Sequence, residues 1–109
     1  MNKIVWVLVS ATSQKEAEKI GRAILKKRLA ACFGIYPRSK SVYFWPPGSN
    51  RFEQSKGPLL VLETLPKNVT MASSVVKKLH SDKVPFVGSL TVNNLNPQFL
   101  KWMRGEVKI

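Results

Sequence analysis

The sequence of 109 residues has little of the material from which disulfides and closed metal sites are built. It contains one cysteine, one histidine and six acidic residues. One cysteine cannot form a disulfide within the chain, and this scarcity is typical of proteins from a reducing compartment. A structural zinc site needs about four ligands, which one cysteine and one histidine cannot supply within one subunit. Any metal site would therefore have to recruit carboxylates or a neighbouring chain.

Long apolar runs are also absent. The opening "MNKIVWVLVSATS" imitates a signal peptide, but its apolar run, Ile4–Val9, is short and rich in Val and Ile. That composition favours a buried first strand. Nothing in the sequence approaches the roughly 20 apolar residues of a membrane span. We therefore expect a cytoplasmic protein without a membrane partner.

Negative charge is scarce, since 18 Lys and Arg residues face six acidic ones and the net charge is +12. A field of that sign attracts phosphates and acidic surfaces, although lysines also serve simply to keep a protein soluble. No RNP or helix-turn-helix pattern is present, so we expect no sequence-specific nucleic-acid binding. Both interpretations of the charge stay open at this point.

Catalytic motifs are missing as well. There is no glycine-rich phosphate loop, no HExxH and no convincing Ser-His-Asp order. A Cys and a His without an orienting third group are a weak basis for nucleophilic catalysis. We expect no enzymatic activity. The apolar content of 44% instead predicts one globular domain over residues 1–109.

The first half of the chain predicts a strand, a helix and a region of extended chain. Ser13 and Glu16 stand at capping-box spacing at the start of "SQKEAEKIGRAILKKRLA", whose apolar residues recur on one helical face. "AACFGIYP" and "SKSVYFW" are rich in β-branched and aromatic residues, and predict one long strand or two strands broken near Pro37. "PPGSN" predicts a turn.

The second half repeats the alternation. "PLLVLET" predicts a central strand, "PKNVTMASSVVKKLHS" a helix ending near His80, and "FVGSLTVNN" the last strand. "NPQFLKWM" predicts a short terminal helix with Asn96 as N-cap and Pro97 in its first position. The order strand, helix, strand, strand, helix, strand predicts an α+β fold. It is the ferredoxin-like split βαβ sandwich, with an antiparallel sheet and both helices on one face.

The stretch "RLAACFGIYPRSKSVYFW", together with "LLVLET", "KLHSDKVPFV" and "NPQFLKWM", closely resembles the CutA family of divalent-cation tolerance proteins. The resemblance runs from about Val5 to Trp102. It implies a ferredoxin-like subunit, a tight homotrimer related in shape to the PII signalling proteins, and a role in tolerance of copper and other divalent ions. It implies no required cofactor, and copper or another divalent cation as a possible ligand.

The resemblance also supplies two candidate metal ligands. Cys32 stands at the family's cysteine in "AAC", and His80 at the histidine of its "His-Pro-Tyr-Glu-Val-Pro" segment, where this chain carries Asp82 and Lys83 in place of Tyr and Glu. A thiolate and an imidazole suit Cu(I) if the fold or a trimer interface brings them together. The alternatives are a buried structural cysteine and a histidine that bonds free carbonyls at a helix end.

A second function stays open beside metal tolerance. A PII-like trimeric regulatory module would use Lys and Arg in the clefts between subunits to hold a small anionic ligand. The charge balance favours this alternative, whereas the resemblance favours metal tolerance.

Overall fold

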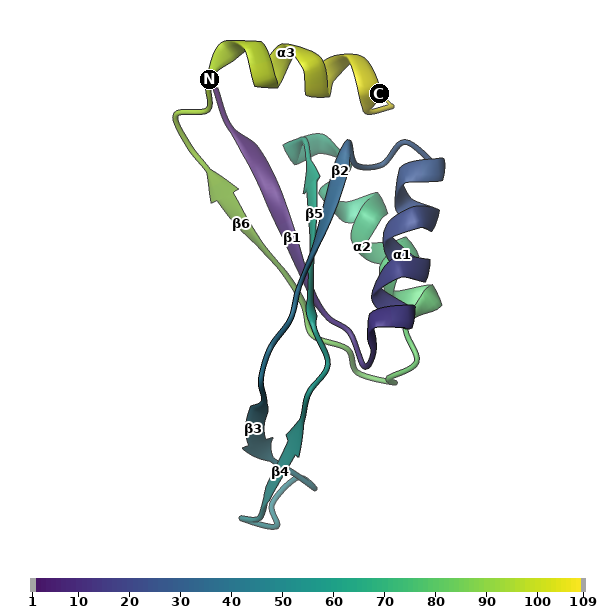
Figure 1. Ribbon diagram of the computed structural model, residues 1–109, viewed down its shortest axis with the longest axis vertical. Coiled ribbons are helices and arrows are strands. Elements are labelled where there is room, and N and C mark those ends of the chain that lie inside the picture. Colours follow the sequence, from purple (N-terminus) through teal and green to yellow (C-terminus); the bar gives the residue numbers. More distant parts are fainter. Residues whose placement is uncertain (1, 109) are drawn as a thin grey trace.

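The structure, a computed structural model, describes residues 2–108. Strands and helices alternate along the chain in the order shown in Figure 1. The elements are β1 (Ile4–Ser10), α1 (Gln14–Lys26), β2 (Cys32–Tyr36), β3 (Ser41–Phe44), β4 (Phe52–Ser55), β5 (Leu59–Thr64), a 3-10 turn (Pro66–Asn68), α2 (Val69–Leu79), β6 (Val87–Val92) and α3 (Pro97–Glu106).

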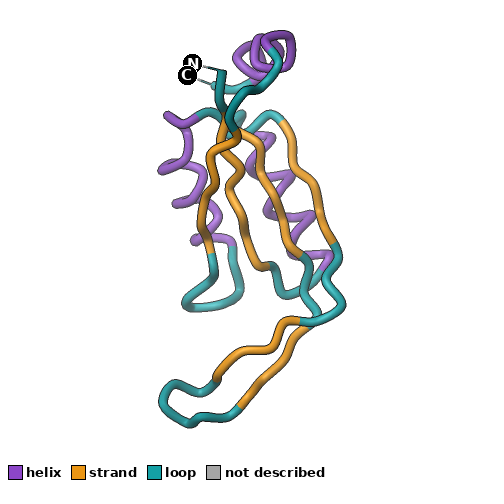
Figure 2. Tube along the Cα trace, turned by 90° about the vertical axis from the view of Figure 1, so that its left-hand side faces the viewer, coloured by secondary structure: helices purple, strands orange, loops and turns teal. Residues whose placement is uncertain are grey.

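The main sheet is antiparallel and has the strand order β2-β5-β1-β6. Helices α1 and α2 lie over one face of this sheet, and α3 crosses the end where β1 begins (Figure 1). In Figure 2, which looks onto the opposite face, the strands lie in front of α1 and α2. The predicted ferredoxin-like fold is confirmed, and only one broad face of its sheet is covered by these two helices.

The core lies between the sheet and this helical layer. Strand residues alternate in direction, so every second side chain of β1 points at the helices. The largest fully buried members of this core come from β1, β5, α1 and α2: Val7, Val9, Leu60, Leu62, Ile20, Ile24 and Val76. A second apolar cluster packs beneath α3: Ile4, Leu65, Leu100, Met103 and Val107.

The extended region predicted from "AACFGIYP" and "SKSVYFW" breaks near Pro37 into two strands, β2 and β3, as one of the two predicted possibilities had it. β3 pairs with β4 in a separate two-stranded sheet, and the sequence patterns did not predict β4. The turn between them contains Gly48 and Asn50 with φ of 76° and 60°, as "PPGSN" indicated. This hairpin projects from the end of the sheet opposite α3 (Figure 2) and gives the chain extents of 48 × 26 × 22 Å.

Two helix starts differ in detail from the predictions. The Ser13 hydroxyl accepts a hydrogen bond from the Glu16 backbone N–H at 3.1 Å, which is one half of a capping box. The other half is missing, because the Glu16 carboxylate turns to Thr12 and Ser81 instead. Asn96 occupies the N-cap of α3 and Pro97 its first turn, but the Asn96 side chain makes no capping hydrogen bond.

Gly57 lies where the chain enters β5 and allows a close backbone approach. A Cβ at this position would overlap the Ala11 carbonyl oxygen. We expect Gly57→Ala to lower the free energy of unfolding by about 2 kcal/mol, since the overlapped atom is backbone and cannot turn away. Gly105→Ala is the control, because its Cβ would meet nothing within 4 Å in α3. It should raise stability by about 0.5 kcal/mol, and equal thermal shifts for the two variants would contradict this account.

Candidate functional site

His80 is the C-cap of α2, and its side chain is fully buried. Its Nε2 lies 2.7 Å from the Ser10 carbonyl oxygen at the end of β1, and its Nδ1 accepts the Asp82 backbone N–H at 3.0 Å. Because Nδ1 accepts a hydrogen bond, Nε2 carries the ring proton and donates it to Ser10. The sequence suggested that His80 bonds free carbonyls at the end of its helix. The structure shows that its ring bonds the Ser10 carbonyl of strand β1 instead. His80 therefore ties the end of α2 to β1.

Both ring nitrogens of His80 are thus occupied by backbone groups. A metal ion needs a free nitrogen lone pair, and here the Nδ1 lone pair receives the Asp82 N–H. Asp82 contributes this bond through its backbone. Metal binding at His80 would first have to displace one of the two hydrogen bonds and open a buried site.

Glu16 completes a polar cluster around His80. One carboxylate oxygen accepts hydrogen bonds from the Thr12 N–H and hydroxyl, both at 2.9 Å, and the other accepts the Ser81 N–H at 2.9 Å. The first oxygen also lies 3.7 Å from His80 Nε2. Burial acts to raise the pKa of Glu16, but hydrogen bonds from Ser81 and Thr12 outweigh it and lower the pKa to about 2. The charged carboxylate holds the start of α1 to the loop after α2.

Cys32 belongs to a row of side chains on the face of the sheet away from α1 and α2. Strand register places Cys32 beside Glu63, Glu63 beside Trp6, and Trp6 beside Leu90. The Trp6 indole Nε1–H donates to Glu63 Oε2 at 3.1 Å. The row therefore combines a thiol and a carboxylate on neighbouring strands.

The chemistry of the Cys32 thiol follows from this position. Burial raises its pKa, and the charge of the Glu63 carboxylate and a hydrogen bond with it raise the pKa further. A metal ion binds the thiolate, so a raised pKa weakens metal binding at neutral pH. A soft cation can bind Cys32 only if it displaces the proton of the thiol.

The fold does not bring Cys32 and His80 together within one chain. Cys32 lies in the row of Trp6, whereas His80 contacts Ser10, four residues further along β1. Four strand residues correspond to about 13 Å. Among residues 2–108, no group of three or more His, Cys, Asp and Glu side chains could hold a metal ion. The residues of one described subunit therefore do not fit a closed metal centre, and a shared ion would have to lie between subunits.

Large apolar side chains remain exposed on the sheet face opposite the helical layer and on the hairpin. Leu90, in the row of Cys32, is 57% exposed, and Phe44 and Phe52 on the hairpin are 67% and 72% exposed. The two phenylalanine rings pack on each other at 5.1 Å. Monomeric soluble proteins rarely present so much apolar surface without a partner.

Comparison with known proteins identifies the family. The model of the CutA1 divalent ion tolerance protein family matches residues 5–106. The chain belongs to the CutA1 family. Protein CutA of Mus musculus is 32% identical over 95 residues, which cover 87% of this chain and 52% of that protein. Divalent-cation tolerance protein CutA of Thermus thermophilus is 31% identical over 98 residues, which cover 90% of this chain and 92% of that protein.

Solved CutA structures share the fold of this CutA1 family member. The solved structure of CutA from Archaeoglobus fulgidus matches with a TM-score of 0.89 at 26% identity, over 97% of this chain and 99% of that one. The chain spans 65% of the length of the Danio rerio homolog and 52% of the mouse protein. The recognised resemblance and the ferredoxin-like fold are both confirmed, and the comparisons do not favour the PII-like alternative.

The predicted location is not confirmed for this CutA1 protein. The protein from A. fulgidus is described as periplasmic. Within residues 2–108, no helix combines the length and apolar character needed to cross a bilayer.

Sequence reasoning missed Glu63 and Trp6, which follow the candidate cysteine in the same cross-strand row. One signal was available, because Glu63 is the single charge in the "LLVLET" strand, whose first four residues are apolar. A carboxylate in such a strand needs a hydrogen-bond donor or a charge partner. The sequence could not identify the Trp6 indole as that donor, because the pairing depends on the register between β1 and β5.

Proposed function

We propose that this chain acts as a homotrimer in the tolerance of divalent metal ions such as copper, without catalysing a reaction. Membership of the CutA1 family over residues 5–106 carries this proposal. Its relatives from A. fulgidus and T. thermophilus are named for divalent-cation tolerance and not for a reaction. The proposed location is the cytoplasm, on the basis of the single free cysteine.

The trimer is supported by the side chains that one chain leaves uncovered. They lie on the sheet face away from the helical layer and on the hairpin. Figure 1 shows this hairpin projecting beyond the sheet. The strands β2 and β6 also present unpaired edges, which proteins normally cover. The exposed apolar side chains in these regions are Tyr36, Val42, Tyr43, Phe44, Trp45, Phe52 and Leu90.

Metal contact in this proposal is weak and depends mainly on Cys32. The thiol is partly exposed on the face where subunits would meet, so copies of Cys32 and Glu63 could approach one another. His80 contributes less, because both of its nitrogens already serve backbone groups. No cofactor is required for folding in this view.

A Cu(I) titration of wild type, Cys32→Ala and His80→Ala tests the ligand assignment. We expect Cys32→Ala to weaken Cu(I) binding at least tenfold and His80→Ala to change it less than twofold. Wild-type affinity should rise from pH 7 to pH 9, because the raised pKa of the thiol keeps it protonated at neutral pH. Tight binding that depends equally on both residues would contradict the proposal.

A further inference from the structure

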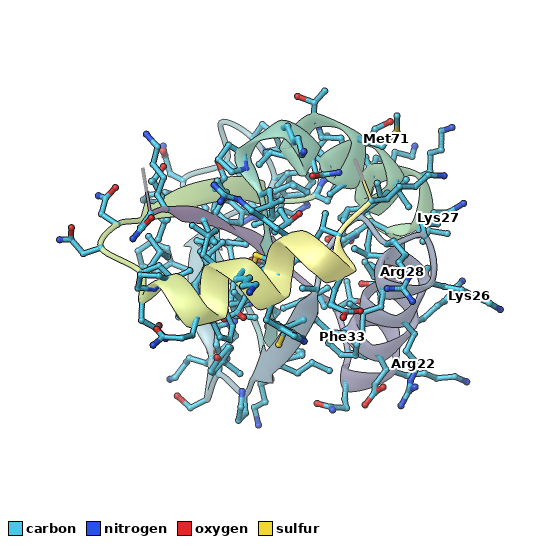
Figure 3. All side chains as sticks on the ribbon, turned by 90° about the horizontal axis from the view of Figure 1, so that it is seen from above. Arg22, Lys26, Lys27, Arg28, Phe33 and Met71 are labelled. Carbon is cyan, nitrogen blue, oxygen red and sulfur yellow. The ribbon has the colours of Figure 1, made fainter. Side chains whose placement is uncertain are left out.

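The outer side of α1 carries a row of cations. Lys15, Lys19, Arg22 and Lys26 are all exposed, and they follow one another at spacings of four, three and four residues. These spacings place them on one face of the helix. At 1.5 Å per residue the row is about 16 Å long. Figure 3 shows Arg22 and Lys26 extending away from the body of the molecule.

Carboxylates do little to neutralise this row. Glu16 is occupied by the Thr12 and Ser81 hydrogen bonds, and Glu18 pairs with Arg22 at 3.0 Å on the surface. Within the part of the chain that the structure describes, none of the three lysines of the row has a carboxylate within 4.0 Å. Their charge is therefore directed to solvent.

Helix stability does not explain the row. Lys15 stands in the first turn, where the helix dipole disfavours a cation. Lys15 and Lys19, like Arg22 and Lys26, are like charges at i,i+4, which destabilise a helix. Only Lys26, at the last turn, is favoured by the dipole. An anionic partner outside the chain would relieve this repulsion.

The chemistry of the surface favours one class of polyanion. Neither α1 nor α2 contains an aromatic residue, so the helical layer offers no platform on which single-stranded bases could stack. The apolar face of α1, with Ile20 and Ile24, is buried in the core and cannot insert into a bilayer. What remains is a regular line of charge that suits a phosphate backbone. We propose that the α1 row binds duplex nucleic acid through its phosphates, without reading its sequence.

The proposed homotrimer is compatible with this surface. The proposed contacts use the opposite sheet face and the hairpin, and Figure 2 shows that α1 and α2 lie behind that face, so the trimer would leave the helical layer on its outside. The nucleic-acid proposal does not depend on metal binding, and either can fail without the other.

Fluorescence anisotropy with a labelled 25-base-pair DNA duplex tests the proposal between 50 and 200 mM NaCl. Four phosphate contacts predict a salt slope of about −3.6, which corresponds to a loss of roughly 150-fold in affinity over that range. In the variant Lys15→Gln, Lys19→Gln, Arg22→Gln and Lys26→Gln, most of this slope should disappear. Lys19→Gln alone should reduce the slope by about one, which keeps the test valid if the fourfold variant does not fold.

A charge-matched control separates the α1 row from net charge. Four exposed cations outside the helical layer and the hairpin are changed instead: Lys3→Gln, Lys67→Gln, Lys101→Gln and Arg104→Gln. This variant loses the same number of positive charges as the α1 variant, and it should keep at least three quarters of the wild-type salt slope. Equal losses in the two variants, or no duplex binding at 50 mM NaCl, would overturn the proposal. The proposal would also be overturned if the fourfold α1 variant lost binding to phosphatidylserine vesicles but kept binding to the duplex.

Discussion

Leu90→Glu should convert the proposed trimer into a monomer at micromolar concentration. Leu90 lies on the sheet face away from α1 and α2 and is 57% exposed in one chain, so a carboxylate there costs the monomer little. In a trimer built on this face, each copy would bury an unpaired charge, at a cost of several kcal/mol per subunit. Light scattering coupled to size-exclusion chromatography measures the change directly.

Ser89→Glu is the matched control for this prediction. Ser89 is the neighbouring residue of β6, and strand alternation points it to the other face of the sheet. Ser89 is also exposed, so both variants add one exposed carboxylate to β6 and differ only in the face of the sheet to which it points. Ser89→Glu should remain trimeric. A monomeric wild type would remove the trimer proposal, and a trimeric Leu90→Glu would show that subunits meet elsewhere.

Glu16→Ala should lower the free energy of unfolding by about 3 kcal/mol at pH 7. The folded state holds the pKa of Glu16 at about 2, against 4.5 for an unperturbed glutamate, and its side chain is only 10% exposed. A shift of this size corresponds to about 3 kcal/mol. The variant also leaves the Thr12 and Ser81 N–H groups without their acceptor. Denaturant unfolding at one protein concentration measures the effect.

The stabilisation by Glu16 should depend on pH, because it requires the charged carboxylate. A carboxylate whose pKa is lowered on folding stabilises the protein fully above the unfolded value and loses that contribution as pH falls toward the folded value. Between pH 5 and pH 2, the free energy of unfolding of the wild type should therefore fall by about 3 kcal/mol more than that of Glu16→Ala. Glu18→Ala, which breaks a surface pair with Arg22, should cost under about 0.5 kcal/mol. Parallel pH profiles for wild type and Glu16→Ala would show that Glu16 does not hold the loops together.

Local patterns in the sequence were sufficient for the order of the elements around the main sheet and for the fold class. Periodic apolar residues predicted both long helices, and β-branched runs predicted β1, β5 and β6. The quoted motifs were specific enough to indicate the family that residues 5–106 match. These features depend on neighbours a few positions apart, so they can be read without a three-dimensional structure. The short polar strand β4 escaped because "FEQS" carries no apolar alternation.

The arrangement of the site depended on contacts between residues distant in the chain. Glu16 looked like half of a capping box, but its carboxylate finds the Ser81 N–H 65 positions away. Cys32 and His80 looked like a ligand pair, yet Cys32 lies in the cross-strand row of Trp6 and His80 contacts Ser10 at the other end of β1. Strand register and the packing of α2 against the sheet set these distances, and a shift of register by one residue would reverse every side chain on a strand. Apolar periodicity reports which face of an element is buried, but it does not report which polar groups meet across that face.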